Sequence, residues 1–333
     1  MIFSVLASSL FGKNKVINDN RYKDESLAPL LLGCHLFQLS EGHFRRGRCG
    51  FEIHPAVSLF VIEANLTELI SLEFSTQRTC LFFISVVVAI AMEAEAMPFV
   101  EYLKLEKDES LFEEHLPFQA FSGNHKGSKV TVITNGKDTV YQTGVDNVGT
   151  VPAALATYLA LSKLKGSVDL LINAGTAGGF QRKGAGIGDV FLTSAVSHHD
   201  RRIAIPGFDS YGTGTLENSS SEVILGPDRL ASQLGFKTGV VSTGNSLDKT
   251  EQCDANMLAN DASVKDMEAA SIAWSCALLK VPFLGVKVVT DIVDGGIPSQ
   301  EEFLQNLSDA AKSLQKAIPA VLEAVIGKVY EEI

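Results

Sequence analysis

Cysteine is scarce in this 333-residue sequence, and the few cysteines follow no structural pattern. The five cysteines stand at positions 34, 49, 80, 253 and 276, with no CxxC pair and no repeated CxxC spacing. This absence argues against a zinc ribbon or a disulfide scaffold and fits a reducing compartment. We therefore expect free thiols in a chain that is long enough to bury a well-packed core.

Long runs of basic or of apolar residues are also absent. The sequence has 28 Lys and Arg against 39 Asp and Glu, a formal net charge of -11, and no basic run that could follow a phosphate backbone. Nucleic acid is therefore a poor hypothesis for a partner. The longest apolar stretch, residues 81–92, falls well short of the roughly 20 residues of a membrane-spanning helix. It is better interpreted as a buried strand, and we expect no membrane partner.

The N-terminal 80 residues lack the patterning of the rest of the chain. Their opening, MIFSVLASSLFG, has no basic residue ahead of its apolar core, which does not fit a secretory signal. Acidic and basic residues are balanced there, whereas transit peptides avoid acids. We expect a cytoplasmic protein in which residues 1–80 form an extension outside the main fold, either poorly ordered or due to an inaccurate start site. A small extra subdomain is the alternative.

From Ile84 onward, short β-rich apolar runs alternate with amphipathic segments and glycine-rich turns. The predicted strands are 84–91, 129–135, 168–174, 188–196, 238–243 and 283–290. The predicted helices are 151–163, 267–280 and 307–329. Such alternation is typical of an α/β fold. We expect a single domain, residues 84–333, with a central twisted mixed sheet flanked by helices.

Acidic residues stand where several of these predicted elements end or begin. Glu95 follows the first strand, Asp291 follows the sixth, and Glu268 lies where a helix begins. The third strand ends in a glycine-rich stretch with a threonine, NAGTAGG at 173–179. Ligands of open α/β sheets bind beyond the carboxyl ends of the strands. We therefore expect these groups to meet at one rim of the sheet.

Each of these signals alone has an ordinary structural explanation. Glu95 and Glu268 fit first-turn acids favoured by a helix dipole, and Asp291 fits a turn. Residues 173–179 fit a tight turn that needs glycine for its backbone angles, and they match neither GxGxxG nor a P-loop. Together, three acids without a metal-ligand pattern indicate acid–base chemistry on a neutral or cationic centre, with no metal and no cofactor.

Two other polar groups of the predicted strands have structural interpretations. Lys287 shares a strand face with Asp291 by the period of two. A lysine in VKVVTD is not expected to be buried alone, so we expect it to pair with one of the three acids. Adjacent side chains on a strand point in opposite directions, which disfavours a metal site at His198, His199 and Asp200. A structural role near a subunit contact is the expectation there.

Eight ordered segments carry a resemblance to a known family. They are AMEAEA (91–96), GTVPA (149–153), NAGTAGGF (173–180), GDVFL (188–192), HDRRI (199–203), STGNSLD (242–248), NDASVKDMEAAS (260–271) and VVTDIVDG (288–295). From Ile84 to about Phe303 the chain resembles the plant branch of the 5′-methylthioadenosine/S-adenosylhomocysteine nucleosidases, in the purine nucleoside phosphorylase superfamily. Residues 1–80 have no counterpart in that family pattern.

The resemblance implies an enzyme of methionine salvage that hydrolyses the N-glycosidic bond of 5′-methylthioadenosine to adenine and the thioribose. It leaves S-adenosylhomocysteine open as a second substrate, and it implies a homodimer without cofactor or metal. Asp291 would protonate adenine at N7, Glu95 would be the general base for the attacking water, and Glu268 would bind the ribose. The other nucleoside-binding residues that the family implies are Thr176, Ala177, Gly178, Leu247, Lys265, Asp266 and Met267, with Lys287 in support.

Two alternatives to a hydrolase stay open in the sequence. A phosphate-dependent nucleoside phosphorylase would hold phosphate with arginines. The chain has no arginine between Arg78 and Arg182, which favours water, although Arg201 and Arg202 remain available for such a role. A non-catalytic storage protein of the same fold would be expected to have lost one or more of the acids, whereas all three are present.

Overall fold

A ten-stranded mixed sheet forms the centre of the computed structural model, which describes residues 83–219, 221 and 223–329. The strands are β1 (Ser85–Ile90), β2 (Glu106–Lys107), β3 (Gln119–His125), β4 (Ser128–Thr134), β5 (Leu170–Gly179), β6 (Val190–His198), β7 (Leu216–Glu217), β8 (Lys237–Thr243), β9 (Ala262–Asp266) and β10 (Phe283–Ile292). Parallel and antiparallel pairs both occur, so the expected mixed sheet is confirmed. Residues 1–80, where we expect an extension, lie outside the described residues.

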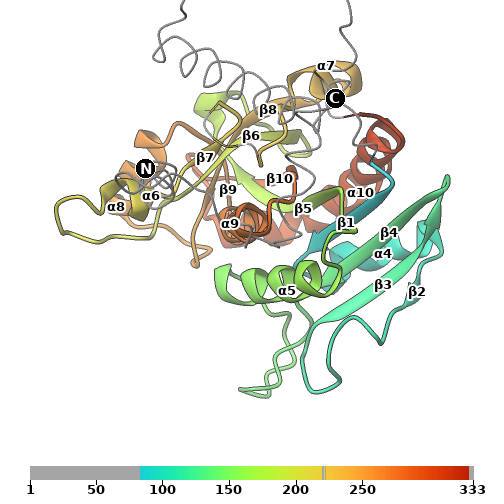
Figure 1. The fold of residues 1–333 in the computed structure, drawn as a ribbon. Coiled ribbons are helices and arrows are strands. Elements are labelled where there is room, and N and C mark those ends of the chain that lie inside the picture. The colour runs from blue at the N-terminus through green and yellow to red at the C-terminus, as the bar shows by residue number, and fades with distance from the viewer. Residues whose placement is uncertain (1–82, 220, 222, 330–333) are drawn as a thin grey trace, which may run out of the picture. The chain divides into compact units, whose positions relative to one another are not determined.

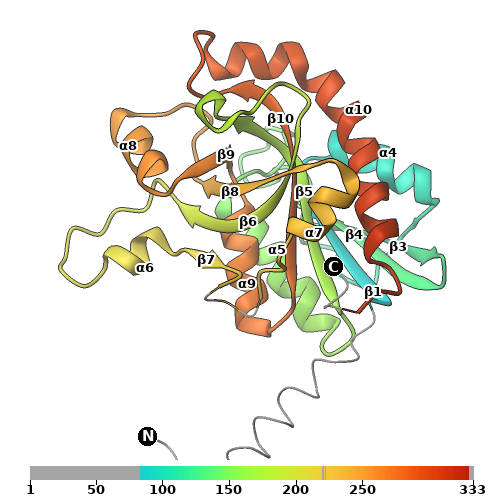
Figure 2. The same ribbon diagram turned by 90° about the horizontal axis from the view of Figure 1, so that it is seen from above.

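Helices cover both faces of this sheet (Figures 1 and 2). They are α4 (Glu93–Leu103), α5 (Thr150–Lys163), α6 (Asp209–Thr213), α7 (Asp228–Leu234), α8 (Glu251–Ala259), α9 (Ala269–Leu279) and α10 (Ser299–Val325), with a short 3-10 helix, η1 (Gln181–Lys183). Helices α4 and α10 share one buried apolar cluster with the sheet, and α5 and α9 share another. None of the helices in the described residues is long and apolar enough to cross a membrane.

Strand β1, with the sequence SVVVAI, shows how the chain supplies both layers of the core. Side chains alternate along a strand, so Val86 and Val88 join the cluster of α4 and α10, whereas Val87 joins that of α5 and α9. Parallel pairing with β4 and β5 buries both faces, and β-branched residues suit such a position. The strand is therefore a rigid support for the segment that follows it.

Five strands close on themselves beside the open part of the sheet. Strand β10 pairs with both β5 and β6, β8 pairs with both β6 and β9, and β9 pairs back to β5. This closure brings the ends of β5, β9 and β10 together, and β1 lies next to β5. Polar residues at these four ends consequently meet in one place.

The six strands predicted from the sequence are confirmed, with β5 extending farther than expected. Strands β3 (QAFSGNH) and β9 (ASVKD) were not predicted, because their polar residues hide the pattern of a strand. Helix α10 begins at Ser299, eight residues before the predicted start, and it ends at Val325. Its first turn carries Glu301 and Glu302, acids that favour a helix N-terminus but add nothing to the apolar stripe on which the prediction depended.

Candidate active site

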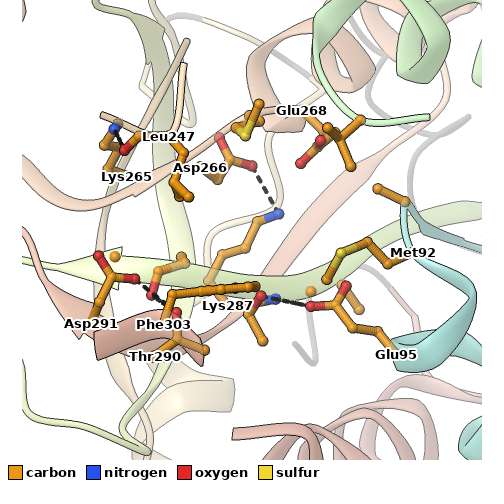
Figure 3. Close-up of a pocket in the computed structure, with 18 of the residues that line it drawn as sticks. Met92, Glu95, Leu247, Lys265, Asp266, Glu268, Lys287, Thr290, Asp291 and Phe303 are labelled. Carbon is orange, nitrogen blue, oxygen red and sulfur yellow. Dashed lines mark hydrogen bonds and ion pairs between the residues drawn. The ribbon is translucent and has the colours of Figure 1, made fainter. Parts of the chain in front are cut away.

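A cavity of about 280 Å³ opens at the joined ends of β1, β5, β9 and β10. This volume is near the lower end of the range for small-molecule sites. All eleven site residues predicted from the sequence line it: Glu95, Thr176, Ala177, Gly178, Leu247, Lys265, Asp266, Met267, Glu268, Lys287 and Asp291. The expected convergence of the three acids at one rim is therefore what the fold produces, and Figure 3 shows them in the same pocket.

Glu95 enters the cavity from the first turn of α4 and is 5% exposed. One of its oxygens accepts hydrogen bonds from the Thr176 backbone N–H at 3.0 Å and from the Thr176 hydroxyl at 2.6 Å. Burial raises the pKa of Glu95, while the two Thr176 bonds and the charge of Lys287 act in the opposite direction. Glu95 is thus both a first-turn acid and a cavity residue, and β5 fixes its position.

The glycine-rich stretch at 173–179 continues strand β5, so the prediction that it forms a turn is wrong. Its glycines are needed for close approach. A Cβ on Gly175 would lie 3.3 Å from a Glu95 oxygen, and one on Gly178 would lie 2.9 Å from an Asp291 oxygen and 2.6 Å from a Val293 methyl. The side chain of any larger residue at Gly178 would collide with the Asp291 carboxyl group.

Glu268 stands at the N-cap of α9, with Met267 beside it in the cavity wall. The backbone N–H of Gly149, at the start of α5, donates a hydrogen bond of 2.8 Å to its carboxylate. Burial raises the pKa of Glu268 to about 7, and the neighbouring Asp266 carboxylate adds to this effect. The Glu268 carboxyl group therefore titrates close to neutrality.

Lys287 forms a buried ion pair with Asp266, at 2.8 Å and with side chains 1% and 0% exposed. The expectation that Lys287 pairs with Glu95, Glu268 or Asp291 is therefore wrong. The Asp266 carboxylate also accepts hydrogen bonds from the Thr243 hydroxyl and the Ala269 backbone N–H. Because Asp266 holds the first turn of α9 as well as the lysine, this acid is the better partner. The Lys287 charge still acts through space on Glu95 and Glu268, where it lowers the pKa.

Asp291 lies near the end of β10 and is 3% exposed. The pairing of β10 with β5 shifts register between Val289 and Asp291, and this bulge lets the consecutive Thr290 and Asp291 both line the cavity. Burial raises the pKa of Asp291, although the Thr290 hydroxyl, which donates to it at 2.9 Å, opposes the shift. The protonated form of Asp291 is therefore favoured relative to a free carboxyl group.

Lys265 fixes a loop that forms another wall of the cavity. Its ammonium group donates to the backbone oxygens of Leu247 at 2.5 Å and Asp248 at 2.8 Å. Burial lowers the pKa of Lys265, and the charge of Asp291 acts in the opposite direction. Lys265 thus supports the loop at Leu247 and Asp248, and its ammonium group lies near the Asp291 carboxyl group.

Several lining residues were not singled out from the sequence. Met92 and Phe303 line the cavity as apolar groups, and the Thr290 hydroxyl donates a hydrogen bond to Asp291. Met92 and Thr290 lie inside the AMEAEA and VVTDIVDG segments, so their position in the sequence offered a signal. Residues 295–303 were expected from the sequence to form a loop near the 5′ sulfur of the substrate, and Phe303, which lines the cavity, belongs to the first turns of α10.

The arrangement suits acid–base chemistry across a bound small molecule. In Figure 3, Asp291 and Glu95 lie at opposite ends of the cavity, and Glu268 lies on a third side. A proton donor on one side of a ligand and a base on the other can act on it in a single step. Among the described residues that line the cavity there is no arginine, and both of its lysines are engaged by protein oxygens.

Comparison with known proteins agrees with this geometry. The model of the phosphorylase superfamily matches residues 85–323. The chain belongs to this superfamily.

Within the superfamily, the chain groups with nucleosidases. It is 45% identical over 245 residues to the 5′-methylthioadenosine nucleosidase of Arabidopsis thaliana, covering 73% of this chain and 88% of that protein. It is 39% identical over 250 residues to a 5′-methylthioadenosine/S-adenosylhomocysteine nucleosidase of the same plant, covering 75% and 94%. The solved structure of the Arabidopsis thaliana 5′-methylthioadenosine nucleosidase in apo form superposes with a TM-score of 0.71 at 42% identity, covering 75% of this chain and 99% of that one.

Proposed function

We propose that this chain hydrolyses the N-glycosidic bond of 5′-methylthioadenosine, releasing adenine and the thioribose. The observation that carries the proposal is the meeting of three carboxyl groups around one cavity: Glu95 and Asp291, which are buried, and Glu268, which is half-buried. The similarity to nucleosidases supports the choice of substrate. The work required is proton donation to the purine, activation of a water and stabilisation of a cationic ribose.

Asp291 is the proton donor in this proposal. An adenine anion is a poor leaving group, and protonation at N7 lets the base depart as a neutral molecule. The raised pKa of Asp291, caused first by its burial, favours the protonated carboxyl group that this step needs. The Leu247–Asp248 backbone, which Lys265 holds in place, lies beside Asp291 in position to contact the same base.

Glu95 is the general base for the attacking water. A base must be ionised to take a proton, and burial alone would leave Glu95 too protonated. The two Thr176 hydrogen bonds and the charge of Lys287 favour its ionised form. Because Asp291 and Glu95 face each other across the cavity, the water would approach from the side opposite the departing adenine, as in inverting glycosidases.

Glu268 binds the ribose hydroxyls and stabilises the positive charge that develops at the anomeric carbon. A carboxylate in a water-poor cavity interacts more strongly with such a charge than one in solution. We assign the Lys287–Asp266 pair a positioning role, since it fixes the first turn of α9 from which Glu268 projects. Thr176, Ala177, Gly178 and Met267 complete the nucleoside pocket.

Water is the proposed nucleophile in place of phosphate. Phosphate sites of proteins use arginine, whose fork matches the oxygens of the ion. The cavity lining includes no arginine among the described residues. Arg201 and Arg202 do not line it: Arg201 stacks on Tyr211 and Arg202 reaches the Cys253 sulfur.

We further propose a cytoplasmic homodimer that acts in methionine salvage. Helices α5 and α9 expose apolar side chains that a single copy leaves in water: Val151, Leu155, Tyr158, Trp274 and Leu278. Exposed apolar groups of this size on adjoining helices are typical of an interface. A second copy of this chain is the proposed occupant, in line with the homodimer that the family pattern implies.

Adenine release from 5′-methylthioadenosine, measured with and without phosphate, tests the proposed reaction. We expect release in both conditions at the same rate. The Asp291→Asn and Glu95→Gln variants should each lose about 10²- to 10⁴-fold in kcat, the usual contribution of a positioned acid or base. A rate that depends on phosphate would establish a phosphorylase, and no release at all would favour the storage-protein alternative.

S-Adenosylhomocysteine in a parallel assay reports whether the cavity accepts the longer thioether.

A further inference from the structure

Two polar residues outside the cavity connect to Glu268 through the start of helix α5. We propose that Asn245, held by Asp200, is a positioning residue for the Glu268 carboxylate. It acts by fixing the Gly149–Thr150 backbone, whose first amide holds that carboxylate. The inference rests on the proposed function, because Glu268 is taken there as the group that binds the ribose. Neither Asn245 nor Asp200 lines the cavity.

The first link joins Asn245 to helix α5. Its side-chain oxygen accepts hydrogen bonds from the Thr150 backbone N–H at 2.9 Å and from the Thr150 hydroxyl at 2.8 Å. The preceding residue, Gly149, donates its own N–H to Glu268 at 2.8 Å. Because each peptide group is planar, only the φ and ψ torsions of Gly149 separate these two amides. Anchoring the amide of Thr150 therefore restricts the positions that the adjacent Gly149 amide can take.

The second link joins Asn245 to Asp200. One Asp200 oxygen accepts the Asn245 backbone N–H at 2.7 Å and the Asn245 side-chain NH₂ group at 3.1 Å. An asparagine amide has donors on one side and an acceptor on the other. With its NH₂ group bound to the carboxylate, its oxygen must face Thr150. Asp200 thus sets the orientation of Asn245, which gives a positional role to a residue of the HDRRI segment.

Gly149 shows how closely the two loops approach each other. It has φ of +99°, and a Cβ there would lie 3.0 Å from the Asn245 side-chain oxygen. Glycine is the residue that adopts this backbone conformation without strain. The absence of a side chain at Gly149 therefore leaves the space that the Asn245 oxygen needs to reach Thr150.

The Gly149 amide matters because the Glu268 carboxylate has few favourable partners. Among the described residues, Gly149 is the one hydrogen-bond donor to it. The charged groups that face it are Asp266 from β9 and Glu95 from α4, which raise its pKa, and Lys287 from β10, which lowers it. Losing the amide would disfavour the ionised form and loosen the carboxylate.

The Asn245→Ala variant tests the inference with 5′-methylthioadenosine as substrate. Because Asn245 is exposed, we expect normal folding and a melting temperature close to that of the wild type. We expect kcat/KM to fall roughly tenfold, the size expected for one or two lost hydrogen bonds. The acid limb of the pH–rate profile should move to higher pH, because Glu268 would need a higher pH to ionise.

Substrate analogues separate positioning from a general structural effect. On a deoxy analogue that lacks the ribose hydroxyl bound by Glu268, the loss caused by Asn245→Ala should shrink to about twofold, since the contact is already missing. Thr150→Ser, which keeps the hydroxyl, should behave as the wild type, and Thr150→Val should fall between the two. Gln252→Ala removes another exposed amide, on α8, and is the matched control.

Titration of the free protein distinguishes failure of this inference from failure of the proposed function. Carboxyl ¹³C NMR of glutamate-labelled protein, with Glu268→Gln for assignment, should show a higher pKa for Glu268 in Asn245→Ala than in the wild type. An unchanged pKa with wild-type kinetics would overturn the inference. So would an equal loss on both substrates with an unmoved acid limb. An inactive wild type that still shows the pKa change would overturn the function and leave the positioning role.

Discussion

At the scale of single residues, the surroundings of each acid decide its protonation. Asp291 and Glu95 are both buried, but Glu95 accepts a backbone and a hydroxyl hydrogen bond from Thr176, whereas Asp291 accepts side-chain hydrogen bonds from Thr290 and Ser299. Glu268 lies between two other carboxylates and one lysine. Three residues of the same chemical class can therefore supply a proton, take a proton and bind a hydroxyl in one cavity.

Replacing Glu268 by glutamine should stabilise the protein while it removes activity. The folded-state pKa of Glu268 is raised from 4.5 to about 7, so its contribution to stability is present below pH 4.5 and lost as the pH rises through 7. We expect Glu268→Gln to melt at a higher temperature than the wild type at pH 8, with the difference vanishing near pH 5. Melting curves across this pH range measure it. A difference that grows toward acid pH would contradict the assignment.

Removing Lys287 should have the opposite effect on stability. The Lys287→Met variant leaves the Asp266 carboxylate buried and unpaired, which costs about 3–5 kcal/mol in comparable cases. Urea unfolding at neutral pH measures the loss. The double variant Asp266→Asn/Lys287→Met removes both charges and should recover much of the stability. A double variant as unstable as the single one would mean that the ion pair is not the cause.

At the scale of elements, strand β5 positions much of the site. It binds Glu95 through Thr176 and lies against Asp291 through Gly178. The sequence correctly indicated an apolar strand before this stretch. It could not indicate that the strand continues through NAGTAGG, because a glycine needed for close approach looks the same in a sequence as a glycine needed for a turn.

Gly178→Ala tests the close approach of β5 and β10. The added methyl would meet Asp291 and Val293, so we expect kcat/KM to fall at least tenfold while the fold is retained. Gly186→Ala is the control, since a Cβ there meets its nearest atom, an Asp189 oxygen, at 3.4 Å. Steady-state kinetics and circular dichroism of both variants suffice. Equal activities would show that β10 can yield to the methyl group.

Other elements mark the limits of sequence patterns. The continuous apolar run of β1 and the apolar stripe of α10 could be recognised in the sequence, because burial alone dictates them. The partner of Lys287 was not, because β9 is five residues long and carries charges that hide its strand character. The Asn245–Asp200 contact was equally hidden, since it joins loops 45 residues apart in the chain. Patterns thus predicted that the three acids and residues 173–179 meet at one rim, and the family resemblance supplied the other cavity residues, whereas pairing within the cavity depends on tertiary geometry.

At the scale of the whole molecule, the exposed apolar residues of α5 and α9 predict self-association. Leu155→Lys combined with Trp274→Lys should shift the protein from dimer to monomer, because charges would replace apolar contacts. Sedimentation velocity measures the change. Tyr102→Lys, on the far helix α4 and similarly exposed, should leave the dimer intact. A wild type that sediments as a monomer at micromolar concentration would refute the interface.

Closure of the five strands has a further consequence for the behaviour of the molecule in a crowded cell. An open sheet has two unpaired borders, and such borders can recruit strands from other chains into aggregates. In the described part of the chain, β10 pairs on both sides, which removes one border. At the other border, the two-residue strand β2, with the exposed Glu106 and Lys107, pairs with only Phe121 and Ser122 of β3, and the two-residue β7 forms a further edge beside β6. The ring that assembles the pocket thus removes the border at β10, and the edge that remains for recruitment of another strand is chiefly that of β3.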